Sequence, residues 1–531
     1  MALIIIIFAI INLAALWNLG LELRRSLMMM QQNSYRIDRF RNWLTTSGDS
    51  TSWPRLIGLI VFFLSLVTFS DIRLSMGFVL AFSAGCVIYL SSRKYKKPLV
   101  MTKRAWRIFI TGVVLSLAII FVCVVLFAVH NVKSILFVCA ETSLALYCLS
   151  HLIIIASVWL LTPVEKSITN KYLSEASDIL KGMPRLKIVS ITGSFGKTST
   201  KHFLKRILDE KYSVTMTPGS FNTPMGVVRT IREYLRPYDQ VFIVEMGAKQ
   251  RGDIKEICDL VNPEYGILTA VGEQHLESFK SLENIRATKF ELIDSLPENG
   301  LALINDDFPE IAKTKVTNVN AERYSIHDNN STWRAKDIQY SSKGSLFTVE
   351  GPGVKMELQT QLVGEGNISN LLASIAMAYH LGVEEKEIIR AVAAIEPVEH
   401  RLSMKRTPGG VLILDDAFNS NPFGSKMALD VLKTIEGNRK IIITPGMIEL
   451  GEKQHELNRE FGHYIAQVAD LAIIVGEYNK EAISEGLAEG NMPDEKIMIA
   501  STFNDAQTML AEYIASGDVV LYENDLPDTF K

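Results

Sequence analysis

Five long apolar runs occupy the first 161 residues of the chain and constrain its fold more than any other feature. They cover residues 3–19, about 56–70, about 74–90, about 107–128 and about 134–161, and each is nearly free of charge. Most are long enough to cross a bilayer core of about 30 Å, where the backbone must satisfy its own hydrogen bonds within helices. The sequence therefore predicts a helical membrane domain of about five spans over residues 1–163.

Two alternatives remain open in this region. The second run is short and is separated from the third only by SDIRLS, so these two runs could form a single kinked or re-entrant hairpin. A cleaved signal peptide is the alternative for the first run, but no basic segment precedes this run and no small-residue cleavage site follows it. Five spans are the simplest count.

The basic residues of the loops predict the orientation of the spans. The first loop contains Arg24, Arg25, Arg36, Arg39, Arg41 and Arg55. The third loop contains or borders Arg93, Lys94, Lys96, Lys97, Lys103, Arg104 and Arg107. The second and fourth loops carry only Arg73 and Lys133. Because Lys and Arg are enriched on the cytoplasmic side, the first and third loops are predicted to be cytoplasmic, together with everything after Leu161.

Composition argues against several classes of function. The chain has 55 basic and 58 acidic residues, a balance without the basic footprint of a nucleic-acid-binding protein. Four of the five cysteines, Cys86, Cys123, Cys139 and Cys148, lie in the membrane region, and Cys258 is alone in the rest of the chain. The sequence therefore predicts neither a disulfide framework nor a cysteine-based zinc site.

The remainder of the chain has the pattern of an α/β protein. Residues 164–185 place Ile168, Tyr172, Ala176, Ile179 and Leu180 at helical spacing, which predicts an amphipathic connector. Short apolar runs such as QVFIVEMG and EYGILTAVG then alternate with helical patterns, and a second alternation runs from GVLILDD to DVVLYEN. We predict a central α/β domain at residues 186–398 and a smaller Rossmann-like domain at residues 399–531.

The segment Ile188–Leu208 combines an apolar strand, a glycine turn and a helix. Such turns bind phosphate because glycines let backbone N–H groups converge at a helix N-terminus. Lys197 would reach the outer phosphates and Thr198 a magnesium ion. The general P-loop has four residues between its glycines, whereas only two separate Gly193 from Gly196.

This shorter loop, T-G-x-x-G-K-T-[ST], resembles the phosphate loop of the Mur ligase family. Its residues here are Thr192, Gly193, Ser194, Gly196, Lys197, Thr198 and Ser199. Seven further segments follow in the family's order, among them IVEMGAKQRGDI, GEQHLESFKSLENIRATKFELIDSL, GEGNISNLLASIAMAYHLG, HRLSM and LDDAFNSNP. The resemblance covers roughly Leu186 to Leu521 and is closest to the branch that adds D-alanyl-D-alanine to a UDP-muramoyl tripeptide.

The resemblance implies ATP-dependent amide formation, in which a carboxylate takes the γ-phosphoryl group and an amine attacks the resulting acyl phosphate. The implied cofactors are ATP and two Mg²⁺ ions, and the implied partners are a small-molecule amine and a carboxylate substrate. Lys197 would contact the β- and γ-phosphates, Thr198 the first magnesium, and Glu245 and His275 would be further metal ligands. The predicted spans and their basic loops place the protein in the bacterial plasma membrane, with the catalytic domains in the cytoplasm.

The resemblance also implies roles for residues further along the chain. Lys289, in ATKFELI, would be carbamylated and would bind the second magnesium; the alternative is a helix-surface lysine paired with an acid. The nucleotide-side residues would be Asn367 and Asn370 for adenine, Arg401 for phosphate and Asp416 for ribose, with Asn419 in the same turn as Asp416. Each of these could instead be an ordinary cap or turn residue.

The chain also departs from the family's pattern. The family's G-x-H-N is GEGN here, its G-D-M is P-G-M, and its K-G-S-R-like segment after the last strand is replaced by YENDLPD. The family's domain for the UDP-muramoyl end is missing, and the membrane spans stand in its place. We therefore expect a membrane-embedded ligase with changed substrates, one of them lipid-linked and held in contact with membrane lipids.

Three other functions remain as alternatives. They are an anchored peptidoglycan enzyme that adds D-alanyl-D-alanine, a synthetase of a poly-amino acid such as poly-γ-glutamate, and a membrane switch that hydrolyses ATP without ligation. The presence of Lys289 and His275 argues against the switch, which needs no acyl-phosphate site.

Overall fold

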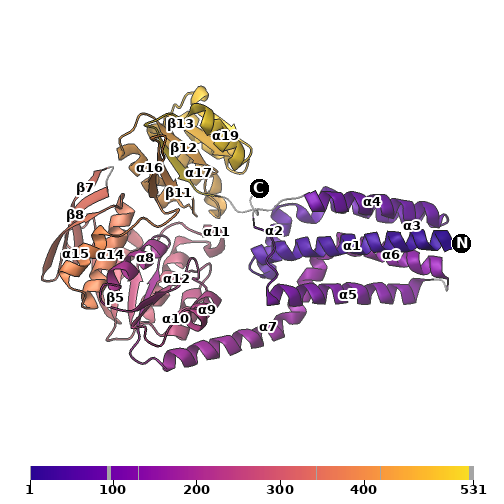
Figure 1. Cartoon of the computed structure of the whole chain (residues 1–531), viewed down its shortest axis with the longest axis horizontal. Coiled ribbons are helices and arrows are strands. Elements are labelled where there is room, and N and C mark those ends of the chain that lie inside the picture. Colours follow the sequence, from indigo (N-terminus) through magenta and orange to yellow (C-terminus); the bar gives the residue numbers. More distant parts are fainter. Residues whose placement is uncertain (1, 93–96, 129–130, 342–343, 419, 526–531) are drawn as a thin grey trace. The chain divides into compact units, whose positions relative to one another are not determined.

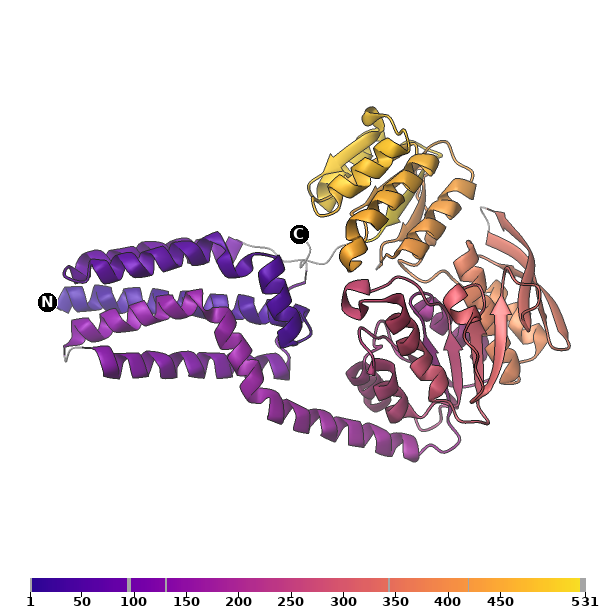
Figure 2. The same cartoon turned by 180° about the vertical axis from the view of Figure 1, so that it is seen from behind.

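The structure is a computed structural model that describes residues 2–92, 97–128, 131–341, 344–418 and 420–525. It divides into two compact units, Met1–Thr169 and Asn170–Leu526. Figures 1 and 2 show the helices and strands of each unit from opposite sides. Arg93, Lys94, Lys96 and Asn419, which the sequence analysis named, lie outside the described residues.

The first unit is helical throughout its described residues. Its helices are α1 (Ala2–Gln32), α2 (Ile37–Thr46), α3 (Trp53–Val67), α4 (Ile72–Ser92), α5 (Lys103–Phe127), α6 (Val132–Cys148) and the first part of α7 (Ser150–Lys181), with a 3₁₀ turn at Asp49–Thr51. Large apolar side chains cover the outside of this bundle: Val67 is 82% exposed, Leu3 70% and Phe121 68%. Such a surface is suited to lipid rather than to water.

Five segments within the described residues are long and apolar enough to span a membrane. They are Leu3–Gln32, Asp49–Val67, Ile72–Ser92, Lys103–Phe127 and Ser150–Lys181. The last predicted run, residues 134–161, is not a single helix, because the helix breaks at Leu149 between α6 and α7. The break adjoins Ser150 and His151, whose side chains contact polar groups of α1 and α3. Figures 1 and 2 show α7 leaving the end of α6 without turning back, so the two helices continue in one direction.

A buried ion-pair cluster joins the helices at this level of the bundle. Glu22 accepts hydrogen bonds from Arg25 at 2.7 Å and from Arg55 at 2.9 Å, and Arg25 also pairs with Asp49 at 2.8 Å. Glu22 and Arg55 are almost fully buried, which charged groups tolerate only when they are paired. Two of the six arginines assigned to the first loop are therefore engaged inside the protein.

The end of α7 belongs to the second unit. Ala176 is fully buried there, and Arg232 of α9 (Pro224–Glu233) lies 4.3 Å above the ring of Tyr172. Ile179, which the helical pattern assigned to the apolar face, is 38% exposed. The predicted connector at residues 164–185 thus coincides with the second half of one continuous helix.

A nine-stranded sheet forms the middle of the second unit. Its strands are β1 (Lys187–Thr192), β2 (Val214–Met216), β3 (Val241–Glu245), β4 (Tyr265–Leu268), β5 (Leu301–Asn305), β6 (Asn320–Ser325), β7 (Trp333–Ser341), β8 (Gly344–Gly351) and β9 (Val354–Thr360). Their order is β2-β3-β1-β4-β5-β6-β7-β8-β9, parallel as far as β7 and antiparallel from β7 to β9.

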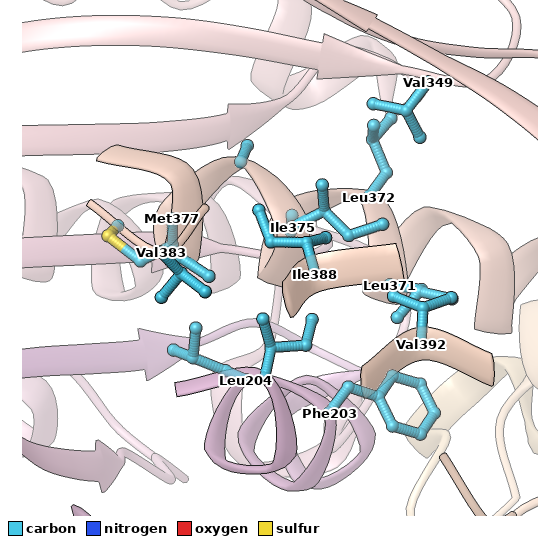
Figure 3. Packing of buried hydrophobic residues seen from close by; sticks show 14 of the residues in the cluster. Phe203, Leu204, Val349, Leu371, Leu372, Ile375, Met377, Val383, Ile388 and Val392 are labelled. Carbon is cyan, nitrogen blue, oxygen red and sulfur yellow. The ribbon is translucent and has the colours of Figure 1, made fainter. Parts of the chain in front are cut away.

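Helices cover both faces of the parallel part, as the alternating pattern predicted. One face packs against α8 (Lys197–Leu208), α14 (Glu365–His380) and α15 (Glu385–Ala393), and Figure 3 shows Phe203 and Leu204 of α8 facing this cluster. The other face packs against α9, α10 (Asp253–Val261), α12 (Leu282–Asp294) and Ala176 of α7. Two short helices, α11 (Leu276–Phe279) and α13 (Pro309–Ala312), lie between strands in the chain order.

The C-terminal part of this unit has its own six-stranded sheet. Its strands are β10 (Ser403–Arg406), β11 (Leu412–Asp416), β15 (Val519–Glu523), β12 (Lys440–Thr444), β13 (Leu471–Val475) and β14 (Ile497–Ala500), in that order, with only β10 antiparallel to its neighbour. Its helices are α16 (Pro422–Thr434), α17 (Gln454–Val468), α18 (Lys480–Glu489) and α19 (Phe503–Tyr513). The predicted Rossmann-like domain is confirmed.

The cluster in Figure 3 predicts a large difference between two leucine substitutions. Leu371 of α14 is fully buried, whereas Leu346 of β8 is 51% exposed. We expect Leu371→Ala to lower the free energy of unfolding of the second unit by about 2–5 kcal/mol, because it leaves a cavity in a packed core. Leu346→Ala is the control and should change the thermal unfolding temperature little. Equal destabilisation by the two variants would contradict this assignment of the core.

Candidate active site

The predicted site residues of the central domain gather at the carboxyl ends of three neighbouring strands. Thr192 ends β1 and Glu245 ends β3, while the loop after β4 leads to His275. The strands β3, β1 and β4 are adjacent and parallel, so their carboxyl ends lie at the same edge of the sheet. Ligands of open α/β sheets bind at such a position.

The loop between β1 and α8 requires its glycines. A Cβ added to Gly193 would lie 2.0 Å from Thr269 Oγ1, and one added to Gly196 would lie 2.3 Å from Asn370 Oδ1. Gly196 also has φ +83°, a backbone conformation that favours glycine. The residues present therefore fit a phosphate group held close to the backbone at the start of α8.

Lys197 is folded back onto this loop. Its Nζ donates to the carbonyl oxygens of Gly193 at 2.6 Å and Ser194 at 3.0 Å. Burial, opposed by the charge of Glu245 and aided by that of Arg401, lowers the pKa of Lys197 to about 8. The ammonium group is thus held at the loop, where a phosphate would be a stronger partner than a carbonyl.

Glu245 is the centre of the polar contacts in this site. Its carboxylate, 1% exposed, accepts from Thr198 Oγ1 at 3.1 Å, from Asn222 Nδ2 at 3.0 Å and from Lys201 Nζ at 2.8 Å. Burial opposes ionisation, but the charges of Lys201 and Lys197 keep the pKa of Glu245 below its usual value. The hydroxyl of Thr198 and this carboxylate provide the oxygen ligands that Mg²⁺ prefers.

Sequence reasoning missed Lys201. It is fully buried, pairs with Glu245 and donates to the carbonyl of Gly219 at 2.7 Å. The signal was present in the sequence, because Lys201 lies four residues after Lys197 and therefore on the same face of α8.

His275 lies at the start of α11 with a left-handed backbone, φ +53°. Its Nδ1 pairs with the carboxylate of Glu449, which belongs to the C-terminal domain. Burial lowers the pKa of His275 despite this carboxylate, while the imidazole and Lys249 lower the pKa of Glu449 against the effect of burial. The segment that contains Glu449 was noted in the sequence, but its contact with His275 was not predicted.

Lys289 lies inside the protein, on α12. It is 2% exposed, and its Nζ is 5.9 Å from the centre of the Phe279 ring. No carboxylate of the described residues lies within 4.0 Å of its Nζ, so the alternative of a surface lysine paired with an acid is wrong. Burial first, and then the charge of Lys197, hold the pKa of Lys289 well below its usual value.

The predicted nucleotide-side residues lie on α14 and in the C-terminal domain. Asn370 adjoins Gly196, whereas the amide of Asn367 donates to the carbonyl of Val363 at 2.9 Å, one turn before it. Arg401 lies 4.4 Å above the ring of Phe418. Asp416 accepts from the Leu402 N–H at 2.9 Å, and burial raises the pKa of Asp416 to about 6 against the effect of Arg401.

Within the described residues, no group of three or more His, Cys, Asp or Glu side chains could hold a metal ion by itself. This suits Mg²⁺, which usually keeps several waters and is bound by one or two carboxylates together with substrate phosphates.

Comparison with known families decides the interpretation of this site. Residues 191–378 match the Mur ligase middle domain, and residues 400–522 match the Mur ligase, glutamate ligase domain. The UDP-N-acetylmuramoyl-tripeptide--D-alanyl-D-alanine ligase of Haemophilus influenzae is 30% identical over 334 residues, which cover 62% of this chain and 72% of that protein. The chain belongs to the Mur ligase family. It is an ATP-dependent, ADP-forming amide ligase.

Two further relatives agree with this assignment. The Bacillus subtilis ligase of the same name is 26% identical over 341 residues, which cover 64% of this chain and 72% of that protein. The crystal structure of the MurF ligase from Thermotoga maritima in complex with ADP has a TM-score of 0.61 and 27% identity, and covers 67% of this chain and 80% of that chain. The central and C-terminal domains therefore have the MurF-like fold that the resemblance implied.

The structure gives physical reasons for two departures from the family's pattern. Gly366 stands where the family's pattern has histidine, and a Cβ there would lie 2.5 Å from Met427 Cε. Gly446 stands where the family has aspartate, and a Cβ there would lie 2.6 Å from Asn458 Oδ1 on a backbone with φ +76°. Neither original side chain fits without a shift of its neighbours.

The position of Lys197 predicts its contribution to nucleotide affinity. Losing one hydrogen bond to a charged partner costs about 1.5–3 kcal/mol, so Lys197→Ala should weaken ATP binding about 10- to 100-fold. Lys205→Ala is the matched control, because Lys205 lies on the same helix but pairs with Asp209. Both affinities can be measured by displacement of a fluorescent ATP analogue from the full-length protein. Equal affinities of the two variants would show that Lys197 does not hold phosphate.

Proposed function

We propose that this protein is a membrane-embedded ligase that joins a small-molecule amine to a lipid-linked carboxylate of a cell-envelope precursor, at the cytoplasmic face of a bacterial plasma membrane. One observation carries the proposal: two Mur ligase domains follow an apolar helical unit with five segments long enough to span a bilayer. A single such segment already anchors a protein effectively irreversibly. The other segments are therefore available for a second task, which we assign to holding the lipid part of the substrate.

A contact between the first and third loops supports their location on the same, cytoplasmic side. Gln31, at the end of α1, donates to the carbonyl of Val100 at 2.8 Å and accepts from its N–H at 3.0 Å. The first and third loops, which hold most of the basic residues, therefore meet at one end of the bundle. Of these residues Arg24, Arg41 and Lys103 are exposed and could contact an anionic lipid head group, whereas Arg25 and Arg55 are held by internal ion pairs.

Each residue of the nucleotide site has a role in this proposal. ATP, when bound, supplies the phosphoryl group that activates the carboxylate for attack by the amine. Thr192 to Ser199 form the cradle, Lys197 places a positive charge beside the phosphates, and Thr198 and Glu245 hold one Mg²⁺ together with His275. The nucleotide side would be completed by Asn367 and Asn370 for adenine, Arg401 for phosphate and Asp416 for ribose.

Lys289 is proposed to be carbamylated and to bind a second Mg²⁺. Carbamylation needs a neutral amine, and the low pKa of the buried Lys289 provides one. The Nζ nitrogen bonds to the carbon of CO₂ and loses a proton, which leaves an anionic carbamate. An anion at this position would also replace the repulsion between Lys289 and Lys197 by attraction.

A second candidate function is supported by the relatives themselves. The Haemophilus and Bacillus proteins are named as ligases of UDP-N-acetylmuramoyl-tripeptide and D-alanyl-D-alanine, and this chain could use the same soluble substrates from a membrane anchor. The departures at Gly446 and in the segment YENDLPD, both in the C-terminal domain, favour a different amine. The comparisons favour either ligase over a poly-amino-acid synthetase or an ATP-hydrolysing switch.

Comparing the intact protein with a shortened one separates the two candidates. The intact protein in lipid should form ADP and ligated product with lipid extract, and a fragment beginning near Val164 should lose this activity while it still binds ATP. That fragment keeps the whole of Asn170–Leu526, the compact second unit. If the fragment ligates UDP-linked tripeptide to D-alanyl-D-alanine as fast as the intact protein, the membrane unit is only an anchor.

The proposed carbamylation of Lys289 leads to a separate prediction. Lys289→Ala should lower the ligation rate at least about 10²-fold, since one charged contact to the reacting groups is lost. Short carboxylic acids such as acetate should restore part of the rate by filling the space of the carbamate. Lys280→Ala, a change in the nearby turn before α12, serves as the control and should leave the rate unchanged. A fully active Lys289→Gln variant would be incompatible with a carbamate.

A further inference from the structure

The segment from Glu449 to Lys453 of the C-terminal domain docks on the loop that carries His275. The N–H of Glu277 donates to the carbonyl of Glu449 at 3.1 Å, and Lys453 pairs with Glu273 at 2.6 Å. A Cβ added to Gly451, between them, would lie 3.3 Å from the Cα of Glu277. The contact is therefore close along its whole length, and it holds Glu449 against His275.

The side chain of Glu449 divides its two oxygens between two partners. Oε2 pairs with Nδ1 of His275, and Oε1 accepts from Nζ of Lys249 at 2.8 Å. Lys249 follows β3, the strand that ends in Glu245, and His275 follows β4. Glu449 also has a left-handed backbone, φ +62°, a conformation that non-glycine residues seldom adopt. A strained residue persists where its surroundings determine it, and such positions cluster at functional sites.

The contact leaves His275 ready to bind a metal. A neutral imidazole that donates its Nδ1–H to a carboxylate carries its lone pair on Nε2, and Nε2 has no hydrogen-bond partner among the described residues. Metal-ligating histidines usually donate their other ring N–H to a carboxylate in this way, which fixes the tautomer and the orientation of the ring.

We infer that Glu449 is a positioning residue of the metal site: it holds His275 in the tautomer and orientation that expose Nε2 to the Mg²⁺ of the nucleotide. Because Glu449 comes from the C-terminal domain, the third metal ligand of the central domain is fixed only while the two domains are docked. This inference rests on the proposed function, in which His275 is a metal ligand.

Metal affinity tests the inference without reliance on catalysis. Mn²⁺ serves as the probe, and its binding to the full-length protein saturated with a non-hydrolysable ATP analogue is measured by electron paramagnetic resonance. We expect Glu449→Ala to weaken Mn²⁺ binding at least about 10-fold, the usual effect of losing such a carboxylate. Glu449→Gln keeps an oxygen that can accept from Nδ1 and should lose less. The affinity for the nucleotide alone should not change.

Two controls separate positioning from other effects. Lys453→Ala removes the neighbouring ion pair between the domains but leaves Glu449 in place, so Mn²⁺ binding should be retained. Glu449→Ala also leaves the charge of Lys249 without its partner, which could by itself repel a cation. The double variant Lys249→Ala/Glu449→Ala removes this charge and should still bind Mn²⁺ weakly. Recovery of normal affinity in the double variant would overturn the positioning role.

Variants of His275 distinguish a failure of its assignment as a metal ligand from a failure of the positioning role of Glu449. If His275→Ala weakens Mn²⁺ binding and adding Glu449→Ala weakens it no further, the two residues act as one unit. If His275→Ala weakens binding but Glu449→Ala does not, the positioning role is wrong while the metal site stands. If His275→Ala has no effect, His275 is not a metal ligand, and both the metal assignment and the inference fail.

Discussion

The buried carboxylate of Glu245 is the interaction on which the catalytic unit depends. An ionised group at the end of a central strand is stable only if hydrogen bonds and opposite charges replace water. Thr198 and Lys201 supply them from α8, and Asn222 from the segment before α9. These contacts tie the phosphate loop and its helix to the neighbouring strand. The need to compensate one buried charge therefore also sets the position at which phosphate and metal would bind.

The need to pair a buried charge within the protein also applies to the N-terminal helical unit, Met1–Thr169. Glu22 is buried among apolar helices, and its pairing with Arg25 and Arg55 joins α1 to α3, while Asp49 completes the cluster. These arginines were counted in the sequence as loop charges that determine orientation. Their side chains also have a structural role, so a charge count alone overestimates the basic surface of the first loop.

The sequence predicted the parts of the structure that are encoded locally. The glycine loop before Lys197, the alternation of strands and helices, and the apolar runs all follow from residues close together in the chain. What it missed depends on residues far apart. Glu449 contacts His275, which lies 174 positions earlier in the chain, and no pattern in either segment predicts this contact. The burial of Lys289 was equally hidden, because the pattern ATKFELI does not show which helix face the sheet and α10 will cover.

The break at Leu149 has a related cause. Residues 134–161 are apolar almost throughout, so the sequence alone favours one uninterrupted helix. Ser150 and His151 interrupt this run, and they contact Ser26 and Arg55 beside the buried ion pairs. Polar groups buried among apolar helices must find partners within the protein, and here the partners lie on helices that are distant in the sequence.

Two departures from the family's pattern, Gly366 and Gly446, lie where neighbouring residues approach closely. A Cβ on Gly366 would meet the end of the Met427 side chain, and one on Gly446 would meet Asn458 and Ile483. Glu523, at the end of β15, is 1% exposed beside Asp416, and burial raises its pKa well above the usual value. It lies in the segment that replaces the family's K-G-S-R-like segment, whereas the phosphate loop keeps the family's residues. The departures therefore lie on α14 and in the C-terminal domain, and the loop that would cradle phosphate is not among them.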